Sequence, residues 1–508
     1  MKKMTQEAHD TSRQSTSNGP HSLTTDEAIF ASSDGFKLFP QPFPGDKLDP
    51  LNWPFAQKHV ILAIVMALYF MFTYITTTTV PSFPELQEVY GATLEQINWT
   101  VATPALGLSL GPLIWASLAD IIGRRPILIL GTIMALASTI GAALAPTYPS
   151  YMAARFFQGL GVSPAANVGL AVINDLFFEH ERGRKVGLWV LAIDLGLPCG
   201  PLIGGFVDLA GYAWIQWLSA IIFCMILVAE LVFLPETLYP RDRMSSSADL
   251  SEKPTTGFSN HHASIRRTRE MLFINVAPVP GVQHPKLHET ITRFIQTFKY
   301  AVVPISIMTY CFAWYWWVLS VVTLVPVAYA DYSPQIQGLL FIGLIVGTLF
   351  SEIFCSGRLS DCMVVKLAHR NGGVKTAEMR LWLIYPAALL TAIGLILWGI
   401  SVDLGAGIQM GNTAVCSYVV DAYPMQSMAV MTFYAVMLNM SAFVDPFFIV
   451  PWVDTAGFTW TMSGHALITV FVCVPAFAFL HRYGSRIREK SGVPPWVNPE
   501  FSKETAAV

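Results

Sequence analysis

GLWVLAIDLGLPCGPLIGG, the stretch at residues 187–205, places glycine at every fourth position of an apolar run, at Gly196, Gly200 and Gly204. Hydrophobic burial does not drive helices together in lipid, so small residues at this spacing favour association by letting a second helix approach to backbone contact. A carboxylate, Asp194, lies near the middle of the ~30 Å hydrocarbon layer that such a helix would cross. The stretch therefore predicts a closely packed membrane helix that moves against its neighbours.

The composition indicates a protein that crosses a membrane many times. Of its 508 residues, 53% are hydrophobic and 13% are charged, whereas soluble domains carry about 25% charged residues. The net charge of -3 is evenly spread, so no basic surface points to nucleic acid as a partner. The sequence contains no phosphate-binding Gly-x4-Gly-Lys-Ser/Thr loop, no HExxH motif and no Cys–His cluster with zinc-site spacing. We therefore expect no enzymatic activity, no metal and no cofactor.

Windows of about 20 apolar residues predict an all-α fold of twelve membrane spans in two bundles of six. The first six spans are 58–80, 97–119, 127–146, 150–173, 184–208 and 213–234, and the second six are 300–326, 336–358, 380–400, 404–424, 427–450 and 462–482. The predicted organisation is a disordered N-terminal tail (1–57) that includes an interfacial LDPLNWP segment, a first bundle (58–234), a linker (235–299), a second bundle (300–482) and a C-terminal tail (483–508).

Lys and Arg are distributed very unevenly between the predicted loops. The loops near 81–96, 147–149, 209–212, 327–335, 401–403 and 451–461 contain neither residue. The loops on the other side, the linker and the C-terminal tail contain nearly all of them. Because basic loops stay on the cytosolic side, we expect both termini and the linker in the cytosol. We expect the plasma membrane as the location, with the vacuole as the alternative, because no sorting signal separates the two.

Three motifs occur in order along the first bundle. They are GPLIWASLADIIGRRP (111–126) after the second span, ARFFQGLG (154–161) in the fourth, and Gly187, Gly196, Gly200, Pro201 and Gly204 in the fifth, spaced as Gly-x8-Gly-x3-Gly-Pro-x2-Gly. Over about residues 50–490 the chain thereby resembles the twelve-helix drug:proton antiporter branch of the major facilitator superfamily. LDPLNWP (48–54), PETLYPR (235–241) and YVVDAYP (418–424) further resemble members from fungi. The resemblance implies a monomer that moves a small molecule and protons by alternating access.

A charged cluster closes the second span. It consists of Asp120, Gly123, Arg124 and Arg125, and we call these four residues the latch. At a membrane edge an acid can cap a neighbouring helix N-terminus, and the arginines can pair with acids such as Asp175 or Glu181. The resemblance implies that this loop latches one conformation and releases in the other. The alternative is that the arginines only set the topology.

Ionisable residues inside the spans are the candidates for proton coupling. Asp194 is the most central acid and our first choice as the proton carrier, followed by Glu352 and Asp445. Glu230 lies about a turn from the end of the sixth span, where it can reach the membrane interface. Arg155, inside the fourth span, either faces the cavity and tunes a nearby carboxylate or extends outward to the interface.

Helix faces suggest where the two halves meet and where a substrate binds. Small residues recur at every fourth position in the second, fifth and eighth spans, which the resemblance places at the seam between halves, where smooth faces can slide. The first, fourth, seventh and tenth spans are expected to line the cavity with Tyr69, Thr73, Asn167, Tyr310, Trp314, Trp317, Gln409 and Asn412. Aromatic and amide groups of this kind suit amphipathic or cationic ligands. The alternative is that the aromatics pack and the polar groups bond between helices.

These features together predict a proton-coupled transporter that exports a small organic molecule such as a drug, toxin, polyamine or secondary metabolite. The antiporter-type glycine pattern decides between export and the first alternative, a proton-coupled importer of a nutrient on the same fold. A membrane sensor that signals through the basic linker is a further alternative. An integral membrane enzyme fits least.

Overall fold

The computed structural model describes residues 49–239, 288–350, 360–371, 377–404 and 427–491. The regular elements in these ranges are helices, and none of them is a strand. Within the described ranges, nine helices are long and apolar enough to cross a membrane. The predicted tenth span at 404–424 lies outside the described residues except for residue 404, and Glu352, Gln409, Asn412 and the side chain of Trp314 lie outside them too.

The first half of the molecule follows the predicted order of spans. Its long helices are α1 (Phe55–Thr77), α3 (Leu94–Ile122), α4 (Arg124–Ala143), α5 (Tyr148–Val162), α6 (Pro164–Leu176), α7 (Glu179–Val207) and α8 (Tyr212–Phe233). Short elements are η1 (Pro50–Asn52), η2 (Val80–Ser82), α2 (Phe83–Tyr90) and η3 (Asp208–Ala210). The fourth span is broken into α5 and α6 because Pro164 has no amide hydrogen to continue the helix. A helix, α2, also occupies the predicted loop at 81–96.

The second half is more irregular. It contains α11 (Glu289–Thr297), α12 (Val302–Tyr310), a π-turn η4 (Cys311–Tyr315), α13 (Trp316–Ala328), α14 (Pro334–Leu339), α15 (Ile342–Phe350), α16 (Ser360–Arg370), η6 (Ala377–Leu383), α17 (Ile384–Leu404), α19 (Ser427–Ile468), a second π-turn η8 (Thr469–Cys473) and α20 (Val474–Ser491). Gly457, with φ 78°, breaks α19 into two parts that correspond to the eleventh span and the start of the twelfth. The helix α11 lies entirely within the segment predicted as linker (235–299).

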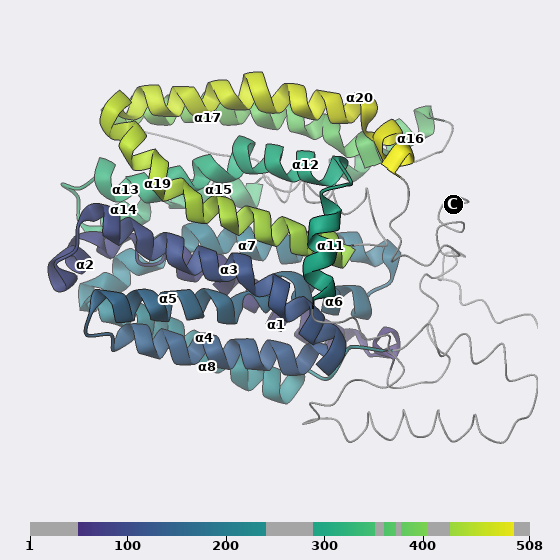
Figure 1. Ribbon diagram of the computed structural model, residues 1–508, viewed down its shortest axis with the longest axis horizontal. Helices are drawn as coiled ribbons and strands as arrows, with labels where there is room; N and C mark the ends of the chain where they lie inside the picture. Colours follow the sequence, from purple (N-terminus) through teal and green to yellow (C-terminus); the bar gives the residue numbers. More distant parts are fainter. Residues whose placement is uncertain (1–48, 240–287, 351–359, 372–376, 405–426, 492–508) are drawn as a thin grey trace, which may run out of the picture.

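The helices lie side by side in two groups (Figure 1). α4 and α8 form the edge of the first half, and α17 and α20 form the opposite edge of the molecule. Between them, α3 packs along α19, and α7 packs against α14 and α15. The Ser109 hydroxyl donates to the carbonyl oxygen of Val436 at 3.0 Å and joins α3 to α19. We call the end of the bundle that holds the latch, α11 and α16 the basic end, and the end that holds α2 and α14 the opposite end.

The glycine-rich helix α7 packs against α1 through paired hydroxyl groups and glycines. The Thr73 hydroxyl donates to the carbonyl oxygen of Ile193 at 2.7 Å, and the Thr77 hydroxyl donates to that of Leu197 at 2.8 Å. These threonines and their acceptors are each four residues apart, so the same contact repeats one helical turn later. It satisfies both hydroxyls without water, as the bilayer interior requires.

The glycines of α7 make room for this contact. A Cβ atom at Gly196 would overlap the carbonyl oxygen of Phe70, and one at Gly200 would overlap the hydroxyl of Thr77. At Gly204 it would overlap the carbonyl oxygen of Thr78. Each partner belongs to α1 or to the residue that follows it, so the three glycines hold the first half together.

The expectation that the small-residue faces slide along the seam is therefore wrong for these positions. In α3 the same holds at Gly107, where a Cβ would overlap the carbonyl oxygen of Phe156 in the first half. The glycine of α7 that contacts Pro334 in the second half is Gly205. A Cβ atom at this position would overlap the carbonyl oxygen of Pro334, at the start of α14. A Cβ at Gly338 would lie 2.8 Å from the carbonyl oxygen of Pro201. This close contact between α7 and α14 lies at the opposite end of the bundle.

We predict that Gly200→Ala lowers stability because the added methyl group meets backbone and hydroxyl atoms of α1. The cost expected for such overpacking is about 1–3 kcal/mol. Thermal unfolding of the purified protein in detergent measures it as a lower midpoint. Gly183→Ala is the matched control, since it lies on the same helix with open space around it. Equal midpoints for the two variants would contradict the α1–α7 contact.

Candidate functional site

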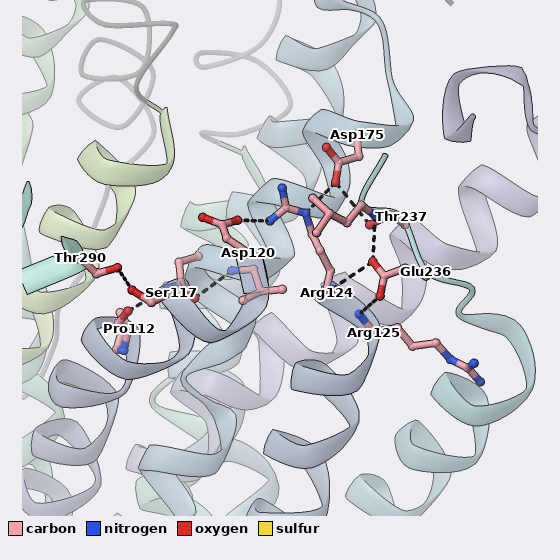
Figure 2. Close-up of polar contacts among 12 residues, drawn as sticks. Pro112, Ser117, Asp120, Arg124, Arg125, Asp175, Glu236, Thr237 and Thr290 are labelled. Carbon is pink, nitrogen blue, oxygen red and sulfur yellow. Dashed lines mark hydrogen bonds and ion pairs between the residues drawn. The ribbon is translucent and has the colours of Figure 1, made fainter. Parts of the chain in front are cut away.

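Arg124 is the centre of a charge network at the basic end (Figure 2). Its Nε donates to Asp175 Oδ2 at 2.7 Å, and its Nη1 donates to Asp120 Oδ1 at 3.3 Å. Asp120 ends α3, Arg124 begins α4 and Asp175 ends α6, so one guanidinium joins three helices. Of the two acids that the sequence offered as partners, Asp175 is the one in contact with Arg124.

The acid that caps α4 is Glu236, a residue of the PETLYPR segment that the sequence analysis did not assign to the site. Its carboxylate oxygens accept from the backbone amides of Arg124 and Arg125 at 3.1 and 3.2 Å. A carboxylate is favoured there because the first amides of a helix have no partner and carry partial positive charge. Gly123 has φ 119°, and a Cβ at this position would overlap the Glu236 carboxylate. Only glycine therefore fits between α3 and the capped helix.

The latch residues thus belong to one polar network within the first half. Arg125 extends it, because its Nη2 donates to the carbonyl oxygen of Leu231 at 2.9 Å near the end of α8. A separate contact reaches the second half: the hydroxyls of Ser117 on α3 and Thr290 on α11 are hydrogen-bonded to each other (Figure 2). The network fixes α3, α4, α6 and α8 to one another, and α11 connects them to α19.

We predict that Arg124→Lys weakens the basic end, because a single ammonium group cannot reproduce two directed contacts of the guanidinium. The expected loss is about 1.5–3 kcal/mol in the free energy of unfolding. Chemical denaturation of the purified protein measures it. Arg184→Lys, the same exchange at an exposed position of α7, is expected to stay within about 0.5 kcal/mol of the unmodified protein. A similar loss in both variants would contradict the network.

Arg155 lies fully buried among backbone carbonyl groups. Its Nη1 donates to the carbonyl oxygen of Ile75 and to Gln158 Oε1, both at 2.7 Å. Its Nε and Nη2 donate to the carbonyl oxygen of Thr100 at 3.2 and 3.1 Å. Among the described residues its hydrogen-bond acceptors include no carboxylate. Arg155 joins α5 to α1 and α3, which fits neither an arginine that tunes an acid nor one that extends to the interface.

We predict that Arg155→Lys loosens the opposite end of the first half. Lysine has too few donors in the wrong geometry, so it leaves at least one of the buried carbonyl groups unpaired at a cost of about 1–3 kcal/mol. Amide hydrogen exchange is expected to rise in the last turn of α1 and the second turn of α3, compared with unmodified protein. Unchanged exchange in both turns would show that the carbonyl groups do not depend on Arg155.

Several residues predicted to line a cavity instead join helices of the first half. Tyr69 is buried with its ring stacked on Trp189 of α7 at 3.8 Å between centroids. Asn167 is fully buried, and its Nδ2 donates to the carbonyl oxygen of Pro112 at 3.2 Å. With Thr73 bonded to α7, these side chains follow the alternative in which polar and aromatic groups bond between helices.

Two predicted aromatic residues lie on the seventh span near α19. Tyr310 is buried with its ring 5.8 Å from that of Tyr434. Trp317 is buried too, and its indole Nε1 has no hydrogen-bond partner among the described residues. Because a π-turn lies between them, Tyr310 and Trp317 are offset from the regular helical spacing that the sequence analysis assumed.

Two acids from opposite halves lie within electrostatic range of one tyrosine. Asp445, on α19, is fully buried, with Oδ1 accepting from the Ser320 hydroxyl at 3.0 Å and Oδ2 without a hydrogen-bond partner in the described part of the chain. Tyr315, the last residue of η4, is buried and interacts electrostatically with both Asp445 and Asp194. Asp194 is half-buried on α7. The structure thus brings two of the predicted acids to one place and adds Tyr315 and Ser320, which the sequence analysis missed.

The π-turns place this tyrosine. In η4 the wider turn interrupts the seventh span, and η8 interrupts the twelfth beside it. The Thr469 hydroxyl lies 3.4 Å from the carbonyl oxygen of Ala313 and links the two turns. Single π-turns inside α-helices occur often at functional sites. No simple sequence pattern signals them, which explains why Tyr315 was not predicted.

The comparisons with known proteins agree with this architecture. The sequence profile of the Major Facilitator Superfamily matches residues 62–406. The chain belongs to this family. Its members are transporters rather than enzymes, so this major facilitator protein is a multi-pass membrane transporter for a small-molecule substrate.

Curated relatives of this transporter include fungal efflux pumps. A probable efflux pump, mfs2, of Aspergillus flavus is 27% identical over 428 residues, which cover 80% of this chain and 98% of that protein. The efflux pump radE of Floropilus chiversii is 26% identical over 470 residues, covering 88% of this chain and 84% of that one. These relatives match a drug-exporter-like branch of the family, as the sequence motifs indicated.

Two solved structures that share this fold belong to transporters named after other substrates. The human organic anion transporter MFSD10 aligns with a TM-score of 0.53 at 16% identity, covering 84% of this chain and 100% of that one. A partially occluded, inward-open structure of the Escherichia coli xylose transporter XylE aligns with a TM-score of 0.51 at 16% identity, covering 84% and 99%. At such identities the likeness shows the major facilitator fold alone.

Proposed function

We propose that this protein is a proton-coupled exporter that exchanges protons for a small organic molecule. The observation that carries the proposal is that Asp445 and Asp194, which belong to different halves, both interact electrostatically with the buried Tyr315. A group that sits between two moving halves is exposed to different surroundings as they rock. An acid in that position can take up a proton on one side and release it on the other.

The choice of acids follows from burial. Asp445 has one carboxylate oxygen without a partner, and an ionised carboxylate so placed is costly to keep out of water. Asp445 therefore holds its proton in this arrangement and releases it when rocking brings water to the seam. The half-buried Asp194 is the more exposed of the two acids. We assign proton exchange to the pair, with Tyr315 between them.

The same site suits an amphipathic cation. Buried aromatic rings lie on the seventh span beside the acids, and aromatic faces attract positive charge. A cation would also compete with the proton for the carboxylates, which is the exchange that antiport requires. The names of the fungal relatives favour export. We assign the basic end to the cytosol, because Lys and Arg gather there, and the protein to the plasma membrane.

The latch has a mechanical role in this proposal. It holds α3, α4, α6 and α8 as one body, so that the first half moves as a unit against the second. Release of Arg124 from Asp120 or Asp175 would let the basic end open.

The second candidate function is import of a nutrient. One observation favours it: solved structures with this fold include a D-xylose–proton symporter.

The experiment that tests the function uses sealed vesicles with an imposed proton gradient. With the unmodified protein, we expect cationic or amphipathic dyes to move against their own concentration gradient, in the direction opposite to the flow of protons. Asp445→Asn is expected to reduce this movement to background, because the amide cannot carry the proton. Asp194→Asn is expected to reduce it as well. Asp454→Asn, an exposed acid on the same helix as Asp445, is the matched control and is expected to leave transport unchanged.

Two outcomes would contradict the proposal. Gradient-driven movement that persists in both variants would remove the acids at the seam from proton coupling. Movement of substrate in the same direction as protons would replace export by import on the same fold.

A further inference from the structure

Glu230 is an intramembrane acid that the seam site does not include. It lies on α8, one turn before the helix ends, and its side chain is fully buried. Neither carboxyl oxygen has a hydrogen-bond partner among the described residues. The expectation that it reaches the membrane interface is therefore wrong. A buried acid of this kind in a membrane protein suggests a functional site by default.

The polar neighbour of Glu230 is Thr132 on α4. The Thr132 hydroxyl donates its hydrogen to the carbonyl oxygen of Leu128 at 3.0 Å, so its oxygen remains available as an acceptor. A protonated carboxyl group can donate to that oxygen, whereas a carboxylate would find no donor there. Burying a charge without a partner costs far more than burying a neutral acid. The contact therefore fits Glu230 in its protonated form.

Charged groups on the elements around α8 are directed elsewhere. They are Arg124 (to Asp120 and Asp175), Arg125 (to the carbonyl oxygen of Leu231), Glu236 (to the first amides of α4), Lys58 on α1 (to the carbonyl oxygen of Leu51), Asp194 on α7 (to Tyr315) and Asp208 in η3 (to Glu85). None of these contacts neutralises a charge at Glu230.

Glu230 lies away from the seam. α4 and α8 form the edge of the first half that is farthest from α17 and α20 (Figure 1). A substrate between the halves therefore does not contact it. The carbonyl oxygen of Leu231, the next residue in the sequence, accepts a hydrogen bond from the Arg125 guanidinium. Glu236, six residues after Glu230, caps α4. The acid is thus remote from the substrate and adjacent to the latch.

We propose that Glu230 is a second protonation site that controls the latch, a role that rests on the latch function given above. While Glu230 is protonated, α8 stays packed on α4 and Arg125 stays on Leu231. When the proton leaves, the unpaired carboxylate is costly to keep buried between the two helices, so the α4–α8 contact opens to water and Arg125 leaves the Leu231 carbonyl group. The closed latch binds one more proton than the open one, so a higher pH at the basic end favours release.

The first test is chemical labelling in membranes with dicyclohexylcarbodiimide, an apolar reagent that adds to protonated carboxyl groups. The acid adds across one C=N bond, the acyl group then migrates to nitrogen, and no group leaves. We expect the adduct on the peptide that contains Glu230, with less adduct as pH rises. Glu230→Gln is expected to lose this adduct, and the control Glu95→Gln, at an exposed acid, is expected to keep it. Absence of the adduct from Glu230 at low pH would overturn the assignment.

The second test follows the latch itself by amide hydrogen exchange at residues 124–128. The intrinsic exchange rate of an amide already rises with pH, so it is divided out first. If one proton is released on opening, the remaining exchange rate rises by about tenfold per pH unit. In Glu230→Gln, which cannot ionise, this extra rise is expected to vanish while the protein stays folded. The same pH dependence in Glu230→Gln and unmodified protein would overturn the proposal. Neither test requires transport, so a failure here is distinct from a failure of proton-coupled export.

Discussion

The backbone contact between α1 and α7 is the constraint on which the rest of the structure depends. Thr73 and Thr77 donate to carbonyl groups of α7, and the glycines opposite them leave no space between the helices. This contact fixes the depth of Asp194 on α7. It also positions the end of α1, where the carbonyl group of Ile75 receives Arg155. In lipid these groups have no water to bond with, so each bond made within the protein also excludes other registers of the two helices.

Strong polar bonding is concentrated within the first half. Arg155 joins three helices near the opposite end, and Arg124 joins three near the basic end. Between the halves, the described contacts are weaker: hydroxyl bonds such as Ser109 to Val436 and close approaches such as Gly205 to Pro334. The helices of the first half are hydrogen-bonded to one another near both ends and only weakly bonded to the second half. The first half is therefore suited to move as a unit, which is the mechanical requirement of alternating access.

The sequence predicted the class of fold well because the length of apolar runs and the placement of Lys and Arg depend only on the bilayer. The motifs also identified the family, because glycine is required wherever two backbones touch. Partners were harder to predict. The fourfold spacing of Gly196 and Gly200 shows that a helix approaches, but which helix depends on the tertiary arrangement, and it is α1 rather than the second half. Glu236 and Tyr315 were missed because a cap supplied from a distant segment and a π-turn leave no local pattern.

Burial also separates the acids by role in a way that depth along a helix cannot. Asp445 and Glu230 are both fully buried with an unpartnered oxygen, yet one faces the seam and the other lies between α8 and α4. At the seam, where we propose that the substrate binds, a change of protonation can be coupled directly to substrate binding. At the edge it can act only through packing, and the packing available there leads to Arg125 and the latch. A transporter with acids in both places can bind protons for exchange at one site and use the other to set how readily its basic end opens.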